Sequence, residues 1–492
     1  YSASWLNSAQ TTIHSDTRTG EILNASILIN ANMISVQYAD RIGATVAIDP
    51  RVRTTVFPQE IQGELIQAAI AQAVGTGLGL TMNWGASCAY PVDSLRSASF
   101  TQKYGLASSV MGGVIINDVA TEEDVRNGVC LVNTKPGPYD ELVIKYLYQP
   151  IYASSLQEEK ETLDSWIREH TGDPYYAYIR NQSRFDSDPR NSRGSLGDDH
   201  LKSFDYMLPN VRKGFENYYS WFAKEDRDFL MRRRVHSALS ERLSGRIYAI
   251  LSYIGGIYLN DIREKDAIPS YSMVDREKQK AALSKALELA KNLDWVDDTA
   301  HLNEFEISDK KADRLRLDIF NGIFGRLPYV EVCTERFPDA AYTASEYLDD
   351  IYGIVWEGVL KHRPLENFER ALQTAFLESI ISTSTATAPI GSFKASKTGF
   401  AATGKPEINL AALRNGGKVD MKMYSLQNAE EVAGFSSIPP IYTNQTKIAA
   451  YYFDLLMRTK DMLKKAISTA PEADRSHYDL LIYRINKATE IE

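Results

Sequence analysis

The chain has 492 residues, a formal net charge of −9 at pH 7, 44% hydrophobic residues and 24% charged residues. This composition is typical of a globular protein of roughly two to four domains, and no apolar run is long enough to span a bilayer. The negative charge argues against sequence-independent binding of nucleic acid, which needs a basic surface. Acidic neighbours surround the one short arginine cluster, 232–234, so we expect a solvated helix face there.

Three cysteines, Cys88, Cys130 and Cys333, are too few and too scattered for a disulfide framework or a cysteine zinc site. One disulfide is compatible with the count, and it would leave a free thiol. The chain begins at Tyr1 without an initiator methionine or a signal peptide. We therefore expect it to be a piece of a longer precursor.

The first 58 residues are expected to be β-strand and loop. A strand is predicted over 22–29 after the turn at Thr19-Gly20, and a short mixed segment over 41–52. Apolar residues then recur at steps of three and four from Ile61, after Pro58 and before a run of glycines. This pattern predicts a helix over about 59–76.

From Gly77 to Pro150 the sequence predicts irregular structure rich in turns, and from about residue 156 it becomes strongly helical. The predicted helices are 156–170, 201–219, 225–259, 276–293, 310–324, 344–361, 365–382, 446–468 and 473–491. A segment rich in small residues, 382–406, is predicted to be a linker or an exposed loop. The expected fold class is α+β and predominantly α-helical, with a small mixed N-terminal part before a helical body.

The stretch QAVGTGLGLTMNWGAS, residues 72–87, carries the most specific pattern in the chain. It resembles the active-site helix of a family of large secreted zinc-dependent metalloproteases of Gram-negative bacteria, which reads HEVGHTLGLRHN. The segments 16–29, 137–151 and 188–213 are also similar to family segments, and SSVM at 108–111 lies where the family has its Met-turn. The resemblance extends to about Phe376 and is weaker beyond it.

The resemblance implies the C-terminal part of a metzincin-like domain in residues 1–150. A helical domain would follow over 151–383, and a linker with C-terminal helices over 384–492. It also implies that this chain starts inside the catalytic domain, and that the protein is extracytoplasmic: periplasmic, associated with the outer membrane, or secreted.

The resemblance places the three zinc ligands of active members at Gln72, Thr76 and Met82, and the general base at Ala73. Zinc prefers imidazole, thiolate or carboxylate, whereas these three side chains are neutral and weak ligands for it. Alanine cannot accept a proton. The catalytic residues are therefore predicted to be lost, and no bound metal is expected.

The scaffold around the lost ligands is predicted to remain, as a structural remnant at Gly75, Gly79, Asn83 and Met111. Gly79 suits a helix end that needs a left-handed residue, and Met111 would pack beneath the site. Gly112 and Gly113 stand where the family usually has an acidic and an aromatic residue, so the shape of this turn is left open. On periodicity alone, the stretch is an amphipathic helix that ends in glycines.

The other candidate metal-binding and partner-binding residues have weaker support in the sequence. The seven histidines have no metal-ligand spacing. Asp186, Asp188 and Asp198 are a low-ranked calcium option, while the favoured interpretation is that Asp198 or Asp199 caps the next helix. The tyrosines at 175–178, 218–219 and 451–452 favour a protein or peptide partner only slightly, since tyrosines at helical spacing are more often core.

Three hypotheses about function follow. The preferred one is a catalytically inactive zinc-metallopeptidase homologue with a binding or scaffolding role. The alternative is an active metallopeptidase that uses a non-standard metal site. An unrelated activity in the helical body is the third, and no motif supports it.

Overall fold

The computed structural model describes residues 9–29, 33–179, 187–191, 195–260, 262, 266, 268–301, 311–383 and 445–489. The fold is α+β and predominantly helical, as predicted, with two small antiparallel hairpins. The strands are β1 Gln10–Ser15 paired with β2 Ile22–Leu28, and β3 Ile257–Leu259 paired with β4 Tyr271–Met273. Within the described ranges, none of the helices combines the length and the apolar character needed to cross a bilayer.

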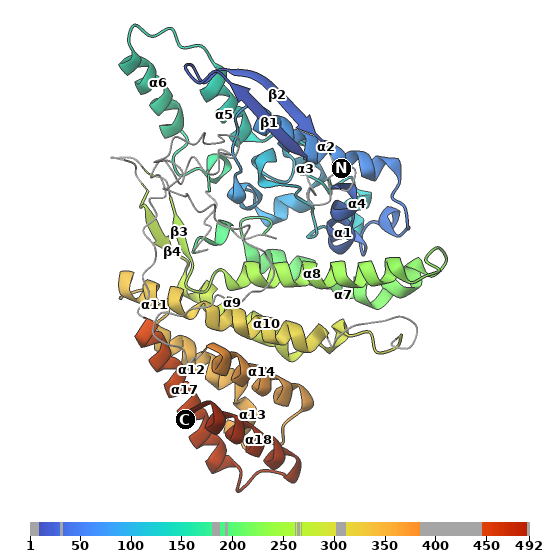
Figure 1. Ribbon diagram of the computed structural model, residues 1–492, viewed down its shortest axis with the longest axis vertical. Coiled ribbons are helices and arrows are strands. Elements are labelled where there is room, and N and C mark those ends of the chain that lie inside the picture. The colour runs from blue at the N-terminus through green and yellow to red at the C-terminus, as the bar shows by residue number, and fades with distance from the viewer. Residues whose placement is uncertain are drawn as a thin grey trace, which may run out of the picture.

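The N-terminal part contains the β1–β2 hairpin and six helices, which occupy the top of Figure 1. These helices are α1 Met33–Thr45, α2 Gln59–Gly77, α3 Ala98–Tyr104, α4 Glu122–Arg126, α5 Pro138–Tyr148 and α6 Leu156–Arg168. The hairpin lies on α2: a Cβ added to Gly77 would be 3.4 Å from Cβ of Ala25. Thr11 also donates a hydrogen bond from its hydroxyl to the carbonyl oxygen of Ala73, at 2.8 Å.

The helical body is a stack of helix layers below this part (Figure 1). The long helices α7 His200–Phe222 and α8 Leu230–Leu251 cross the middle of the molecule and pack side by side. The helices that follow are α9 Arg276–Lys291, α10 Lys311–Gly325, α11 Leu327–Arg336, α12 Ala344–Val355, α13 Glu357–Leu360, α14 Asn367–Thr383, α17 Gln445–Ala466 and α18 Glu472–Thr489. One continuous hydrophobic core joins α1 and α2 to this body.

A buried ion pair connects the N-terminal part to α8. Arg242 and Arg246 on α8 both bond to the carboxylate of Asp118, and the side chains of Asp118 and Arg246 are almost completely buried. Burial opposes the ionisation of Asp118, but the two guanidiniums outweigh it and hold the pKa of this carboxyl below its usual value. A buried charge of this kind is stable only while its partners stay in place.

The helix α1 contradicts the prediction of β and loop for the whole of the first 58 residues. Its stability comes from tertiary packing, because α1 lies directly on α8 (Figure 1). A Cβ added to Gly43 would be 2.5 Å from the carbonyl oxygen of Ala238, so only glycine permits this approach. Residues so distant in sequence leave no local signal for the helix.

Two predicted helices were too long. The segment 225–259 contains α8 only to Leu251, because Gly255 adopts φ +61° and the chain then enters β3. The segment 344–361 is broken into α12 and α13 at Trp356, whose side chain is completely buried. The predicted linker over 382–406 lies outside the described residues beyond Thr383.

The sequence-based prediction also missed the helices α3, α4, α5 and α11. The segment 77–150, predicted to be irregular, also contains α3, α4 and α5, and α11 was not predicted. The remaining predicted helices agree with the structure to within about three residues at each end, and α2 and β2 do so as well.

Candidate functional site: the C-terminal end of helix α2

The helix α2 forms where the apolar spacing predicts it, and its end is set by glycine. Ile61 and Leu65 are completely buried on its inner face. At its C-terminus Leu80 donates its amide hydrogen to the carbonyl oxygen of Gly75 at 3.0 Å, while Gly79 adopts φ +91°. That left-handed conformation suits glycine, and it turns the chain back toward the helix.

Two of the three predicted ligand positions, Gln72 and Met82, come together because of this turn. Gln72 and Thr76 lie one helical turn apart on α2, and the returning chain brings Met82 alongside. The Nε2 atom of Gln72 donates to Sδ of Met82 at 3.0 Å, and the Thr76 hydroxyl donates to the carbonyl oxygen of Gln72 at 3.2 Å. The side chains of Gln72 and Met82 are therefore in direct contact, while the Thr76 hydroxyl bonds to the backbone of α2.

Ala73, at the position of the general base, is buried and presents only a methyl group. Its carbonyl oxygen accepts the hydrogen bond from Thr11 on β1, so the peptide at this position holds the hairpin in place. No proton-accepting side chain is available at Ala73.

The turn at Met111 lies directly beneath α2. Met111 is completely buried, and a Cβ added to Gly75 would be only 2.6 Å from its Sδ atom. The carbonyl oxygen of Met111 accepts a hydrogen bond from the Asn83 amide at 3.1 Å. Met111 thus contacts both Gly75 and Asn83, two of the other predicted remnant residues.

The buried carboxylate of Asp140 fixes this turn, and sequence reasoning missed it. It accepts hydrogen bonds from the Ser109 hydroxyl, from the Val110 amide at 2.9 Å and from the Gly137 amide at 2.9 Å. Asp140 is the third residue of α5, after Gly137 and Pro138. An acidic residue at this position of a helix is a capping signal that the sequence did offer. Gly113, at the end of this turn, has φ +89°, a conformation that favours glycine.

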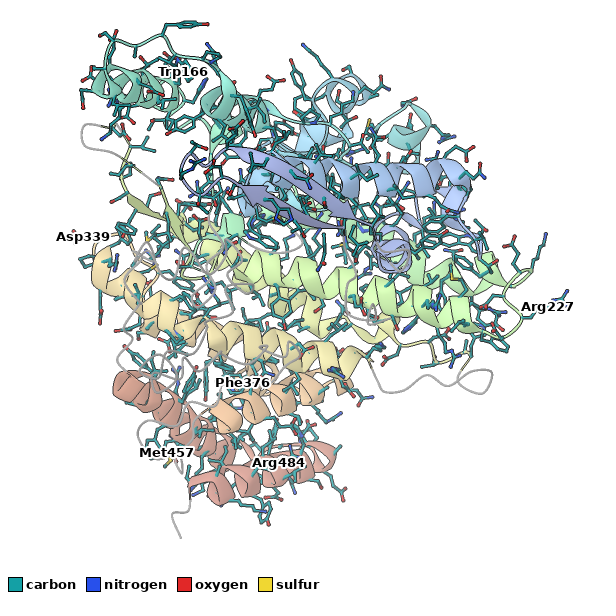
Figure 2. All side chains as sticks on the ribbon, turned by 45° about the horizontal axis from the view of Figure 1, so that its top comes forward. Trp166, Arg227, Asp339, Phe376, Met457 and Arg484 are labelled. Atoms are coloured by element: carbon teal, nitrogen blue, oxygen red, sulfur yellow. The ribbon has the colours of Figure 1, made fainter. Side chains whose placement is uncertain are left out.

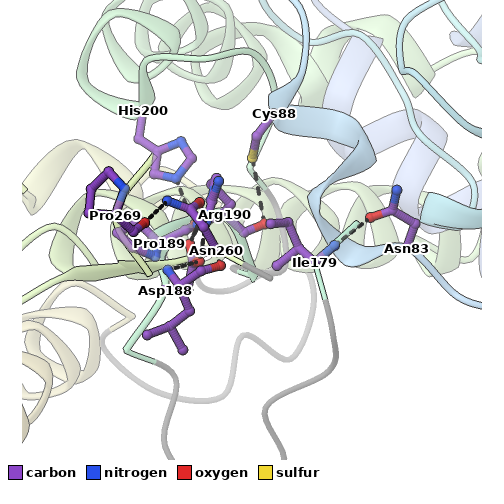
Figure 3. Close-up of polar contacts among 10 residues, drawn as sticks. Asn83, Cys88, Ile179, Asp188, Pro189, Arg190, His200, Asn260 and Pro269 are labelled. Atoms are coloured by element: carbon purple, nitrogen blue, oxygen red, sulfur yellow. Dashed lines mark hydrogen bonds and ion pairs between the residues drawn. The ribbon is translucent and has the colours of Figure 1, made fainter. Parts of the chain in front are cut away.

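Asn83 joins the site to the segment that leads toward residue 179. Its side chain is completely buried and donates to the carbonyl oxygen of Ala177 at 2.9 Å. It also accepts from the amide of Ile179 at 3.1 Å (Figure 3). Asn83 is therefore a structural residue that satisfies two backbone groups.

The aspartates of the calcium option have other partners. Asp188 accepts bonds from the guanidinium of Arg190, at 2.7 Å, and from the amide of Leu259, at 2.9 Å (Figure 3). Asp198 accepts from the amide of Val92 at 3.1 Å, and Asp186 lies outside the described residues. The favoured capping role is confirmed for Asp199, which accepts from the first amides of α7.

Cys88 and His200 are buried, and both have hydrogen-bond partners within the fold. All three cysteines are free thiols. Cys88 is buried 3.2 Å from the Ser195 hydroxyl, and burial raises the pKa of its thiol. His200 is buried, shares a hydrogen bond with the carbonyl oxygen of Pro189 at 2.9 Å, and burial lowers its pKa to about 4 (Figure 3). Among the residues that the structure describes, no three His, Cys, Asp or Glu side chains converge to hold a metal ion.

Comparison with known families supplies the context for this geometry. The profile of the Met-zincin family matches residues 54–363, which is more than half of the chain and includes α2, the Met111 turn and most of the helical body. This chain belongs to the Met-zincin family. Comparison with curated proteins and with solved structures gave no match.

Membership of the Met-zincin family implies zinc, and the residues at the ligand positions do not fit it. The Gln72 amide and the Thr76 hydroxyl are neutral oxygen and nitrogen groups already engaged in hydrogen bonds, and Met82 offers a thioether. Zinc sites in proteins use imidazole, thiolate or carboxylate ligands. The Met-zincin frame is present in this chain without a donor set suited to the metal.

Proposed function

We propose that this Met-zincin is a catalytically inactive homologue of the metallopeptidases, with a binding or scaffolding role outside the cytoplasm. The observation that carries the proposal is the hydrogen bond between Gln72 and Met82, two of the positions at which the resemblance places zinc ligands. We call the site of Gln72, Ala73, Thr76 and Met82 the degenerate centre. A zinc-bound hydroxide needs three good ligands and a nearby base, and neither is available at this centre.

The retained frame supports a role that depends on shape. Gly75, Met111 and Asn83 keep the close contacts of the helix, the turn and the neighbouring segment. The positions of the zinc ligands, Gln72, Thr76 and Met82, carry neutral side chains. The residues that fix the backbone around them make close packing contacts and hydrogen bonds. A protein that still needs its fold for binding would show this division.

The strand β2 offers a means of binding a peptide. It pairs with β1 on one side, and in the part of the chain that the structure describes no strand pairs with its other side. Ile27 and Leu28 are exposed there. An open edge with apolar side chains can accept an extended segment as an additional strand. We therefore propose a protein or peptide partner, consistent with the exposed edge.

Metal content tests the proposal directly. The purified protein is incubated with excess zinc, dialysed, and measured by mass spectrometry for bound metal. We expect far less than one zinc per chain, and no chelator-sensitive hydrolysis of a broad peptide pool. About one chelator-removable zinc per chain, with peptidase activity, would instead establish the alternative of a non-standard active site.

A restored variant tests the frame itself. Gln72→His, Thr76→His and Met82→His, combined with Ala73→Glu, would return the ligands and the base to the positions that the fold brings together. We expect this variant to bind about one zinc per chain. Val74→His combined with Leu78→His is the matched control, because it places two histidines at the same spacing on the other side of α2. A folded restored variant with no more zinc than this control would refute the assignment of these positions.

A further inference from the structure

The C-terminal end of α2 and the neighbouring helix α5 carry an exposed apolar surface, which we call the α2–α5 patch. Its members are large apolar side chains that remain exposed: Val74, Leu78, Leu147, Tyr148, Tyr152 and Leu156. Tyr152 is 98% exposed and Leu156 is 85% exposed, which makes them the most exposed large apolar side chains in the described part of the chain. Isolated exposed apolar residues are ordinary, but a contiguous group marks an interaction surface.

Contacts between the two helices show that the patch is contiguous. The hydroxyl of Tyr148 donates to the carbonyl oxygen of Leu78 at 2.8 Å. A Cβ added to Gly79 would lie 3.7 Å from a methyl group of Leu147. Val74 is one helical turn before Leu78, so α2 and α5 present their apolar side chains at one place.

The patch continues onto α6. Tyr152 lies in the connection between α5 and α6, and Leu156 is the first residue of α6. The two helices touch at one place, where Nζ of Lys145 lies 4.4 Å from the ring centroid of Trp166. Trp166 lies at the end of the molecule opposite Met457 and Arg484 (Figure 2), so this corner is far from the C-terminal helices.

The patch is separate from the degenerate centre. Successive residues of a helix are rotated by about 100°, so Val74 and Leu78 lie on the opposite side of α2 from Gln72 and Thr76. The tyrosines here, Tyr148 and Tyr152, are also not among those that the sequence singled out, of which Tyr218 and Tyr452 are buried in the core. The patch is therefore a second surface, with apolar chemistry.

Carboxylates border the patch along α6. This helix has four acidic residues against two basic ones, and its first turn contains Glu158 and Glu159. Glu158 bonds to the hydroxyl of Ser154, and Glu161 accepts from the amide of Gln157, so both carboxylates have neutral hydrogen-bond partners. The surface thus combines an apolar centre with a negatively charged border.

We propose that the α2–α5 patch docks a protein segment that is apolar on one side and rich in lysine or arginine around it, such as a cationic amphipathic helix. The apolar centre would bury its side chains, and the border would attract and orient the positive charges. A second copy of this chain would bring the acidic border against itself, and an anionic bilayer would be repelled in the same way. This inference adds a second surface and a second kind of partner to the open edge of β2, and it does not depend on the loss of the zinc site.

The test uses two synthetic amphipathic helices of equal length, one of leucine and lysine and one of leucine and glutamate, each with a fluorescent label. Binding to the full chain is followed by fluorescence anisotropy at low and high salt. We expect saturable binding of the leucine–lysine peptide, weakened by salt, and much weaker binding of the other peptide. The variant Tyr152→Ser with Leu156→Ser should lose at least tenfold in affinity.

Phe453→Ser is the matched control, because Phe453 is also an exposed apolar residue but lies on α17. It should bind the leucine–lysine peptide like the unmodified protein, and circular dichroism should show that both variants are folded. Equal binding of the two peptides, or no loss in the double variant, would overturn the proposal. So would self-association in ultracentrifugation, or binding of vesicles that contain phosphatidylglycerol, if the double variant abolished either.

The outcome can be separated from that of the proposed function. Tyr152→Ser with Leu156→Ser leaves the degenerate centre unchanged, so its zinc content should equal that of the unmodified protein. Failure of peptide binding would remove the docking inference alone, and stoichiometric zinc in the unmodified protein would remove the proposed inactivity alone.

Discussion

The contact between Gly75 and Met111 allows a quantitative test of the retained frame. In Gly75→Ala the new methyl group would lie 2.6 Å from Sδ of Met111, where ordinary contacts are 3.4–4 Å. Met111 is completely buried and cannot turn into solvent. Overpacking of this kind costs about 1–3 kcal/mol, while replacing glycine by alanine within a helix returns about 1 kcal/mol. We therefore expect a net change between about zero and a loss of about 2 kcal/mol, and no gain in stability.

The same helix provides the control. Gly63 is also within α2, and a Cβ added there would meet nothing within 4 Å. Gly63→Ala should therefore stabilise the protein by about 0.5–1 kcal/mol, because only the helix preference changes. The assay is urea unfolding followed by circular dichroism, with the slope compared between variants. If Gly75→Ala stabilised the protein as much as Gly63→Ala, the close packing of α2 on the Met111 turn would be wrong.

Three further predictions concern buried groups. Arg246→Ala should cost about 3 kcal/mol in urea unfolding, because it leaves the buried carboxylate of Asp118 with one guanidinium; a loss below about 1 kcal/mol would contradict this pairing. The pKa of His200 is lowered to about 4, so the unfolded chain takes up a proton below about pH 6.5 while the folded chain does not. Stability should therefore fall as the pH drops from about 6.5 to 4, by about 3 kcal/mol more than in His200→Gln, and equal pH profiles would refute the assignment. A thiol reagent should label Cys130 first, since it is partly exposed and the other two cysteines are buried; simultaneous labelling of all three before unfolding would be inconsistent with the fold.

The helix α2 and the turn that follows it could be predicted because their signal is local. The interval between Gln72 and Thr76 is one helical turn, and Gly79 marks the point where the chain reverses. These relations depend on positions within eleven residues of each other. The geometry of the helix then places the side chains, whatever the rest of the fold contributes.

Other features could not be predicted because their causes lie far away in the chain. The helix α1 depends on the approach of Gly43 to Ala238, and the sequence around α1 alone suggests a mixed segment. The end of α8 depends on the turn at Gly255, and the break at Trp356 depends on a side chain buried among distant helices. Asp140 is the exception, since its capping position was available in the sequence.

The bonds of Asp140 have a mechanical consequence. Its carboxylate ties the first turn of α5 to Ser109 and Val110, next to Met111, while the last turn of α5 carries Leu147 and Tyr148. One helix about 16 Å long therefore connects the floor of the degenerate centre to the outer surface of the molecule. A displacement of the C-terminal end of α5 would therefore also move the residues beneath α2. The α2–α5 patch and the degenerate centre are connected through this one helix.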